Sequence, residues 1–185
     1  MLHLLLAALD AMARGPPAHR LLPPGHPLDL SVTVTDYLGH PEHLRLHSPP
    51  KVIETEHRLV FSFSDHDVAG EALAHPVELA FASRATSSFP GAFPPSTVAE
   101  LDRVVAERGI RWPGRETFLE RMLPGGLSNV EQATLIDGAV LTNAPFKPAM
   151  DALRERPARR QVDRRIVYID PTPDARFDFY GPRGS

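Results

Sequence analysis

The order of apolar and polar residues along the chain predicts strands and helices that alternate. In LDLSVTVTDY, residues 28–37, polar residues alternate with the apolar residues Leu28, Leu30, Val32 and Val34. This period of two is typical of a strand with one buried face. The stretch EHRLVFSFS, residues 56–64, predicts a second strand. We expect it to pair with a neighbouring strand across the loop around Pro49 and Pro50.

Start and stop signals predict helices between and around these strands. HPVELAFASRA, residues 75–85, places Pro76 in a first helical turn, where a missing N–H costs least. Thr97 followed by Glu100 forms a capping box, and Gly109 ends that helix. Further helices are predicted at residues 1–15, 115–123 and 145–153.

Two more strands are predicted in the second half of the chain. ATLI, residues 133–136, ends at an Asp-Gly pair, and RRIVYIDP, residues 164–171, has the composition of a buried strand. Strands that alternate with helices indicate an α/β layered domain. A chain of 185 residues fits one such domain and is long enough to bury a core.

Composition narrows the classes of function. The formal net charge is -3 and the pI is about 6.3, so we expect no nucleic-acid partner. The chain has no cysteine, which excludes disulfides, thiolate metal sites and a cysteine nucleophile within it. Its 20 prolines predict many loops and short helices.

The apolar N-terminal stretch MLHLLLAALDAMARG is predicted to be an amphipathic or core helix. No basic residue precedes the apolar run, and Asp10 interrupts it, so it does not fit a signal peptide. The run is also far shorter than the ~20 apolar residues of a membrane span. We therefore expect a cytoplasmic or membrane-peripheral protein. No capping residue precedes Leu2, so we expect the first part of this helix to be missing.

The positions of the histidines suggest a metal site as one hypothesis. All nine lie before residue 76, and His40, His43 and His47 are close together in HPEHLRLH. Imidazoles at such spacing could bind a metal ion. A polar surface loop is the alternative, and it is favoured because no known carboxylate–histidine motif accompanies them. SDHD, residues 64–67, is open to the same two interpretations. We expect neither a metal nor another cofactor.

Two motifs, one in the middle of the chain and one in its second half, are informative as a pair. ATSSFPGAFPP, residues 85–95, could be a rigid loop, and LIDGAVLTNAP, residues 135–145, a strand and a turn. In this order and at this separation, the pair resembles the patatin-like phospholipase family. The matching residues are Ser87, Ser88, Pro90, Gly91, Phe93, Pro94, Pro95, Asp137, Gly138, Ala139, Asn143 and Pro145.

The resemblance implies a three-layer α/β fold and an acyl hydrolase that uses a Ser-Asp dyad. In such a dyad the aspartate accepts the hydroxyl proton of the serine, which then attacks an ester carbonyl. The resemblance assigns the role of proton acceptor to Asp137, within the motif Asp137–Gly138–Ala139. Gly138 would allow the tight turn that directs the carboxylate. It further implies a lipid or other ester substrate and transient membrane contact. The supporting loop would consist of Ser88, Pro90, Gly91, Phe93 and Pro94.

The nucleophile of this family is missing from the chain. None of the twelve glycines belongs to a Gly-x-Ser-x-Gly elbow; GLSNV, residues 126–130, comes nearest but lacks the second glycine. In the family the serine lies upstream of the segment that matches residues 1–40. We therefore expect residues 1–171 to be the C-terminal portion of a patatin-like domain, incomplete at its N-terminus. Residues 172–185 would be a tail or the start of a truncated segment.

Three hypotheses for the function stay open at this stage. The first is a lipid acyl hydrolase with Asp137 as its base, inactive in this chain alone. The second is a catalytically inactive patatin-like remnant that binds a lipid or a protein. The third is a metal site bound by histidines. Within the first hypothesis, the alternative is that Asp137 is only a turn residue. A serine within this chain that reacts as a nucleophile, with Ser128 the first to inspect, would exclude a missing upstream nucleophile.

Overall fold

The computed structural model describes residues 1–14, 22–23, 26–45, 47–48, 51–65, 72–124, 130–142, 144–154, 156 and 161–169. The chain divides into two compact units, Met1–Glu155 and Arg156–Ser185. All helices and strands of the described residues belong to the first unit. The site residues predicted from the sequence also lie there.

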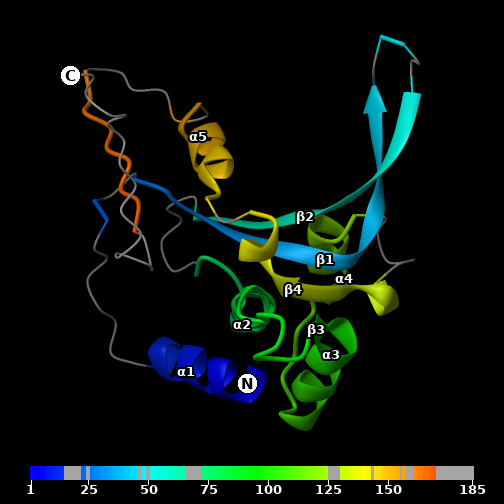
Figure 1. Ribbon diagram of the computed structural model, residues 1–185. Helices are drawn as coiled ribbons and strands as arrows, with labels where there is room; N and C mark the ends of the chain where they lie inside the picture. Colours follow the sequence, from blue (N-terminus) through cyan, green and yellow to red (C-terminus); the bar gives the residue numbers. More distant parts are fainter. Residues whose placement is uncertain are drawn as a thin grey trace, which may run out of the picture. The chain divides into compact units, whose positions relative to one another are not determined.

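The first unit is built on a four-stranded antiparallel sheet with the strand order β2-β1-β4-β3 (Figure 1). Its strands are β1 (Leu28–Arg45), β2 (Lys51–Asp65), β3 (Ser96–Thr97) and β4 (Thr134–Asp137). β1 and β2 form the predicted hairpin, which is longer than the sequence pattern indicates, and β4 is the other predicted strand, which extends to the Asp of the Asp-Gly pair. With five α-helices in the described residues, the fold is mixed α/β.

One face of the hairpin forms the hydrophobic core. The register pairs Val32 with Phe61, and both side chains point to the same side of the sheet. On that side lie α2 (Pro76–Thr86) and α4 (Arg115–Met122). The rings of Phe61, Phe81 and Phe118 are fully buried, with centroids 6.1 to 6.3 Å apart. These contacts between β2, α2 and α4 fix the helices on the sheet.

The remaining helices complete the first unit. α1 (Leu2–Arg14) packs on α2, and α3 (Val98–Glu107) follows β3. Figure 1 shows α1, α2 and α3 below the sheet and α5 (Phe146–Arg154) above it. None of the helices in the described part of the chain is long and apolar enough to cross a membrane.

The helix starts follow the sequence signals, with one difference. The side chain of His75 accepts a hydrogen bond from the Val77 N–H before α2. The hydroxyl of Thr97 accepts the Glu100 N–H at 3.1 Å before α3, as the capping box predicts. The carboxylate of Glu100 does not turn back to the Thr97 N–H; it binds Arg84. The capping box is therefore half formed.

The prediction of a buried strand at residues 164–171 is wrong for the part that the structure describes. Residues 161–169 form no strand, and the exposed fractions of Ile166, Val167 and Ile169 are 64%, 81% and 84%. Residues 170 and 171 lie outside the described residues. A strand needs neighbouring strands for its backbone hydrogen bonds, and the described chain pairs none with this stretch.

Candidate functional site

The two sequence motifs meet where β4 ends. The backbone N–H of Asp137 donates a hydrogen bond to the carbonyl oxygen of Ser88 at 3.2 Å. On the other side, the hydroxyl of Thr35 in β1 donates to the carbonyl oxygen of Asp137 at 3.0 Å. Both backbone polar groups of Asp137 are thus satisfied by residues far away in the sequence, which fixes its position.

The carboxylate of Asp137 is partly exposed, and only one of its two oxygens accepts a hydrogen bond from the described residues. Its Oδ1 accepts the Ala139 N–H at 2.8 Å and so caps the short 3-10 helix η2 (Gly138–Val140). Among the described residues, nothing hydrogen-bonds Oδ2, and no serine hydroxyl hydrogen-bonds either oxygen. The arrangement is that of a turn residue whose second oxygen is available to a proton donor.

Gly138 is required at its position because of close packing. It is buried, and a Cβ added there would overlap the backbone carbonyl group of Thr33 in β1. Its φ is not positive, so the left-handed region is not what selects glycine here. The tight turn expected from the sequence is present, but the reason for the glycine is that η2 lies directly on β1.

Ser88 is a structural residue in this chain. Its side chain is fully buried, and its hydroxyl donates to the Arg84 carbonyl oxygen at 2.8 Å at the end of α2. The guanidinium of Arg84 in turn donates to the Ser88 hydroxyl oxygen. Because this hydroxyl is buried and already both donates and accepts a hydrogen bond, it is not accessible to a substrate. The rest of the predicted loop is exposed and consists of Pro90, Gly91, Phe93 and Pro94.

Arg84 holds this loop in place, and sequence reasoning missed it. It is 3% exposed, and its guanidinium donates to the Pro94 carbonyl oxygen at 3.0 Å and pairs with the Glu100 carboxylate at 3.3 Å. It thereby connects both ends of the loop, at Ser88 and Pro94, to α3. The available signal was one cation among the small and apolar residues of ELAFASRAT.

Several residues of the sequence-based predictions lie outside the described residues. They are Asn143 of the second motif, Ser128, the serine to inspect for nucleophilicity, His66 and Asp67 of the SDHD stretch, and the predicted tail at residues 172–185. Pro145 is described and exposed, just before α5. The structure therefore brings together Ser88, the loop after it and Asp137.

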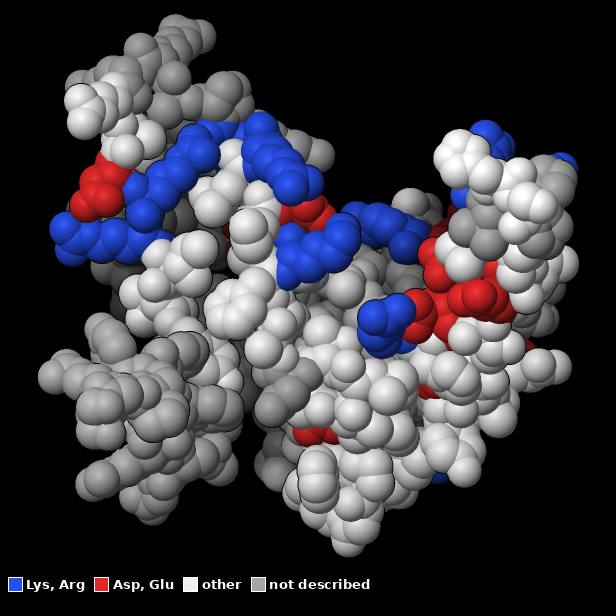
Figure 2. All heavy atoms as spheres, turned by 45° about the horizontal axis from the view of Figure 1, so that its top comes forward, with Lys and Arg blue, Asp and Glu red and all other residues white. Residues whose placement is uncertain are grey.

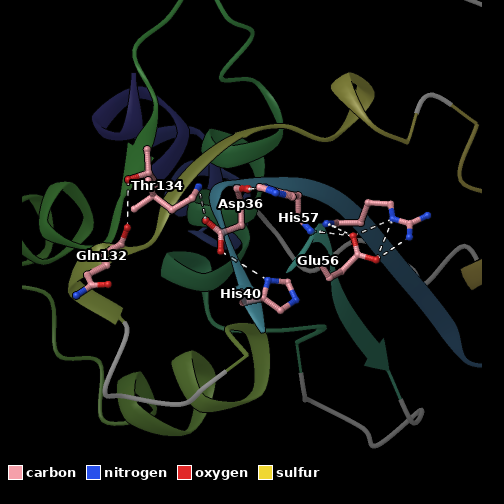
Figure 3. Close-up of polar contacts among 8 residues, drawn as sticks. Asp36, His40, Glu56, His57, Gln132 and Thr134 are labelled. Carbon is pink, nitrogen blue, oxygen red and sulfur yellow. Dashed lines mark hydrogen bonds and ion pairs between the residues drawn. The ribbon is translucent and has the colours of Figure 1, made fainter. Parts of the chain in front are cut away.

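A second polar cluster lies at a bulge in β1 (Figure 3). The register shifts between Thr35 and His40, so that residues 36 to 39 of β1 face His57 of β2 alone. Gly39 has a φ of +77°, and a Cβ there would approach His57 Cε1 to 2.8 Å. Glycine is required on both counts. Such bulges redirect side chains, and this one turns the Asp36 and His40 side chains towards each other.

The polar groups of this bulge are largely buried. Asp36 and His40 are each 9% exposed. Asp36 Oδ1 accepts the Leu38 N–H at 3.2 Å, whereas Oδ2 lies 3.6 Å from His40 Nδ1. A ring nitrogen of His57 lies 2.8 Å from the Asp36 carbonyl oxygen. A cavity of about 50 Å³ adjoins the pair.

Beside the bulge, Glu56 and Arg58 of β2 form an ion pair. The Arg58 guanidinium hydrogen-bonds the Glu56 carboxylate, which also accepts the Arg58 and His57 backbone N–H groups; together they lower the pKa of Glu56 to about 2. Glu56 is therefore ionised at neutral pH, close to His40, its partner in the strand register.

The hypothesis of a metal site at His40, His43 and His47 is not supported by the backbone. His40 and His43 lie three residues apart in β1, so their side chains point to opposite faces of the strand. In the part of the chain that the structure describes, no three histidine or carboxylate side chains are close enough to hold one metal ion together.

Comparison with known proteins does not assign the chain to a family. No family model matches the chain, and neither the curated proteins nor the solved structures contain a match. The functional argument therefore rests on the residues and geometry above.

Proposed function

We propose that this chain is part of a patatin-like lipid acyl hydrolase in which Asp137 is the general base. The proposal is carried by the 3.2 Å hydrogen bond from the Asp137 N–H to the Ser88 carbonyl oxygen. This bond joins the two motifs on which the resemblance to the patatin-like family depends. The pairing of β3, which follows the loop, with β4 brings the two motifs to the same end of β4.

The state of the Asp137 carboxylate supports the role of a base. Its Oδ1 is oriented by the Ala139 N–H, and its Oδ2 accepts no hydrogen bond from the described residues. A general base needs both a fixed orientation and a free lone pair within reach of the proton that it takes. In the proposed reaction Asp137 takes the serine hydroxyl proton as the serine oxygen attacks the ester carbonyl.

The nucleophilic serine must come from outside these 185 residues, because the sequence has no Gly-x-Ser-x-Gly elbow. The substrate class is a carboxylic ester of a lipid. This chain by itself would hydrolyse no ester at an enzymatic rate, since loss of the serine nucleophile of a serine protease costs on the order of 10⁶ in kcat.

Labelling with a fluorophosphonate probe, followed by mass spectrometry, tests the proposal. The probe is applied to this chain and to extract from its source. We expect no label on this chain and a labelled protein in the extract that contains peptides of this sequence. A labelled serine inside this chain, Ser128 being the first to examine, would refute the upstream nucleophile. Peptides of this sequence found only in unlabelled protein would refute the hydrolase.

A second candidate function is an inactive patatin-like module that binds a lipid or protein surface. It is favoured by the large apolar side chains that are exposed near Asp137, since such patches mark contact surfaces. Phe89 and Phe93 follow Ser88 and are 56% and 48% exposed, and Val140 in η2 is 45% exposed. Binding of this chain to phosphatidylcholine vesicles, with no labelled serine in the source protein that contains its peptides, would favour this candidate over the hydrolase.

A further inference from the structure

The connection between α2 and β3 exposes seven consecutive residues that have no polar side chain. These residues, 89–95 with the sequence FPGAFPP, are all exposed, and we call them the apolar loop. The exposed fractions of Phe89 and Phe93 are 56% and 48%. The nearest charged residues along the chain on either side, Arg84 and Glu100, form an ion pair with each other. The loop therefore presents an apolar surface whose side chains can make no hydrogen bond.

The backbone of the apolar loop also has many of its polar groups satisfied. Three of its residues are prolines, which have no backbone N–H. Of the other four N–H groups, those of Ala92 and Phe93 both donate to the Phe89 carbonyl oxygen at 3.1 Å. The Pro94 carbonyl oxygen accepts a hydrogen bond from Arg84 at 3.0 Å. A segment that moves out of water must have its backbone polar groups bonded within the protein, and this loop meets much of that requirement already.

The apolar loop is held in one shape. The buried Arg84 binds Ser88, just before the loop, and Pro94 near its end. Gly91 has a φ of +90°, which favours glycine, and a Cβ built there would meet nothing within 4 Å. The turn around Gly91 therefore faces open space. Because the loop is fixed at both ends, its aromatic side chains lose little conformational freedom when they bind a surface.

A lipid bilayer is the partner whose chemistry fits this surface. Protein interfaces contain about one hydrogen bond per 100–200 Å², whereas acyl chains require none, and the loop has no side chain to form one. Figure 2 shows acidic side chains gathered on the β1–β2 hairpin, where the register pairs Glu42 with Glu54. An anionic membrane would repel such a surface. The charges of the chain therefore favour a bilayer without net charge.

We propose that the apolar loop inserts Phe89 and Phe93 into the interface of a lipid bilayer that has no net charge. Headgroups and water satisfy the remaining N–H groups of the loop there, since the contact is interfacial and does not span the membrane. Ser88 accepts the Asp137 N–H, so a lipid held by the loop lies close to the proposed base. The membrane contact does not require Asp137 to be a base, so either proposal can fail without the other.

Co-sedimentation of the full chain with phosphatidylcholine vesicles tests this contact. Phe89→Gln and Phe93→Gln change exposed side chains, and Met12→Gln is the control, because Met12 on α1 is 75% exposed. We expect the native chain and the control to bind equally, and each loop variant to bind about tenfold more weakly or less than that. Sodium chloride at about 0.5 M should leave the binding unchanged, since no charges carry it. No binding of the native chain, binding that salt abolishes, or equal binding by all four proteins overturns the proposal.

A second measurement detects the loop inside the bilayer directly. Phe93→Trp adds a tryptophan to a chain whose single Trp112 is 9% exposed and so reports the background. Phosphatidylcholine with bromine on its acyl chains quenches a tryptophan that contacts those chains. We expect the emission of Phe93→Trp to be quenched well beyond that of the native chain. A variant that binds the vesicles while its added tryptophan stays unquenched would show that another surface makes the contact, and would overturn the proposal.

Discussion

The backbone N–H of Asp137 lies 3.2 Å from the carbonyl oxygen of Ser88 and donates a hydrogen bond to it. The bond connects the end of β4 to the turn that follows α2. The hydroxyl of Thr35 holds the Asp137 carbonyl oxygen from the other side. The position of the Asp137 carboxylate is therefore set by the sheet and by the loop together, and substitutions in either are expected to affect it.

Gly138→Ala is expected to destabilise the fold, because the added Cβ overlaps the Thr33 backbone, which cannot move without distorting β1. Overpacking of this kind costs about 1–3 kcal/mol, and we expect the upper end. Gly114→Ala is the matched control, since its nearest neighbour is Glu78 Oε1 at 3.6 Å. Urea unfolding of the two variants measures the difference. Equal free energies of unfolding would show that η2 does not press on β1.

Arg84→Ala is expected to cost about 3–5 kcal/mol of unfolding free energy, the range for removing one partner of a buried ion pair. It leaves the Ser88 hydroxyl, the Pro94 carbonyl oxygen and the Glu100 carboxylate without their guanidinium partner.

Arg103→Ala is the control for this change. The Arg103 side chain is 68% exposed and lies 4.0 Å from Glu107, so its loss should cost no more than about 1 kcal/mol. Chemical denaturation of both variants gives the comparison. A loss for Arg84→Ala as small as that of the control would contradict the role of Arg84 as the anchor of the loop.

The Glu56–Arg58 pair predicts an acid-sensitive contribution to stability. The pKa of Glu56 is lowered from 4.5 to about 2, chiefly by the Arg58 side chain. Because the folded pKa is the lower one, this contribution is fully present above pH 4.5 and is lost as the pH falls towards 2.

Thermal unfolding between pH 2 and 6 tests this window in the native chain and in Glu56→Gln. The variant should show a smaller fall in the midpoint temperature across that range. Glu120→Gln, at an exposed position of α4, controls for the general loss of carboxylate charge. Identical pH profiles of Glu56→Gln and the native chain would show that the pair does not contribute.

Local signals predicted much of the fold. The period of two gave the β1–β2 hairpin, Pro76 gave the start of α2, and Thr97 gave the start of α3. Each of these depends on residues adjacent in the sequence, so the sequence alone carries the signal. The placement of Asp137 at the end of β4 followed in the same way.

The rest depends on contacts between distant residues. The exposed stretch at residues 161–169 has the apolar composition of a strand but no partner among the described residues. The bulge at Asp36 follows from the register of two strands, which no local pattern specifies. The role of Arg84 arises only when Pro94 and Glu100 pack around it. The reason for glycine at position 138 is likewise the approach of Thr33.

The central claim is that Asp137 is a catalytic base, and ester hydrolysis by an Asp137→Asn variant tests it most directly. The change is made in the protein that carries both this sequence and the labelled serine, with a p-nitrophenyl ester as substrate. Asn caps a helix as well as Asp does, so the Ala139 N–H keeps its acceptor and the fold should be unchanged. Asp151→Asn, on the exposed helix α5, is the control. We predict that kcat falls by about 10³-fold or more in Asp137→Asn and is unchanged in the control. Full activity of a folded Asp137→Asn protein would contradict the account.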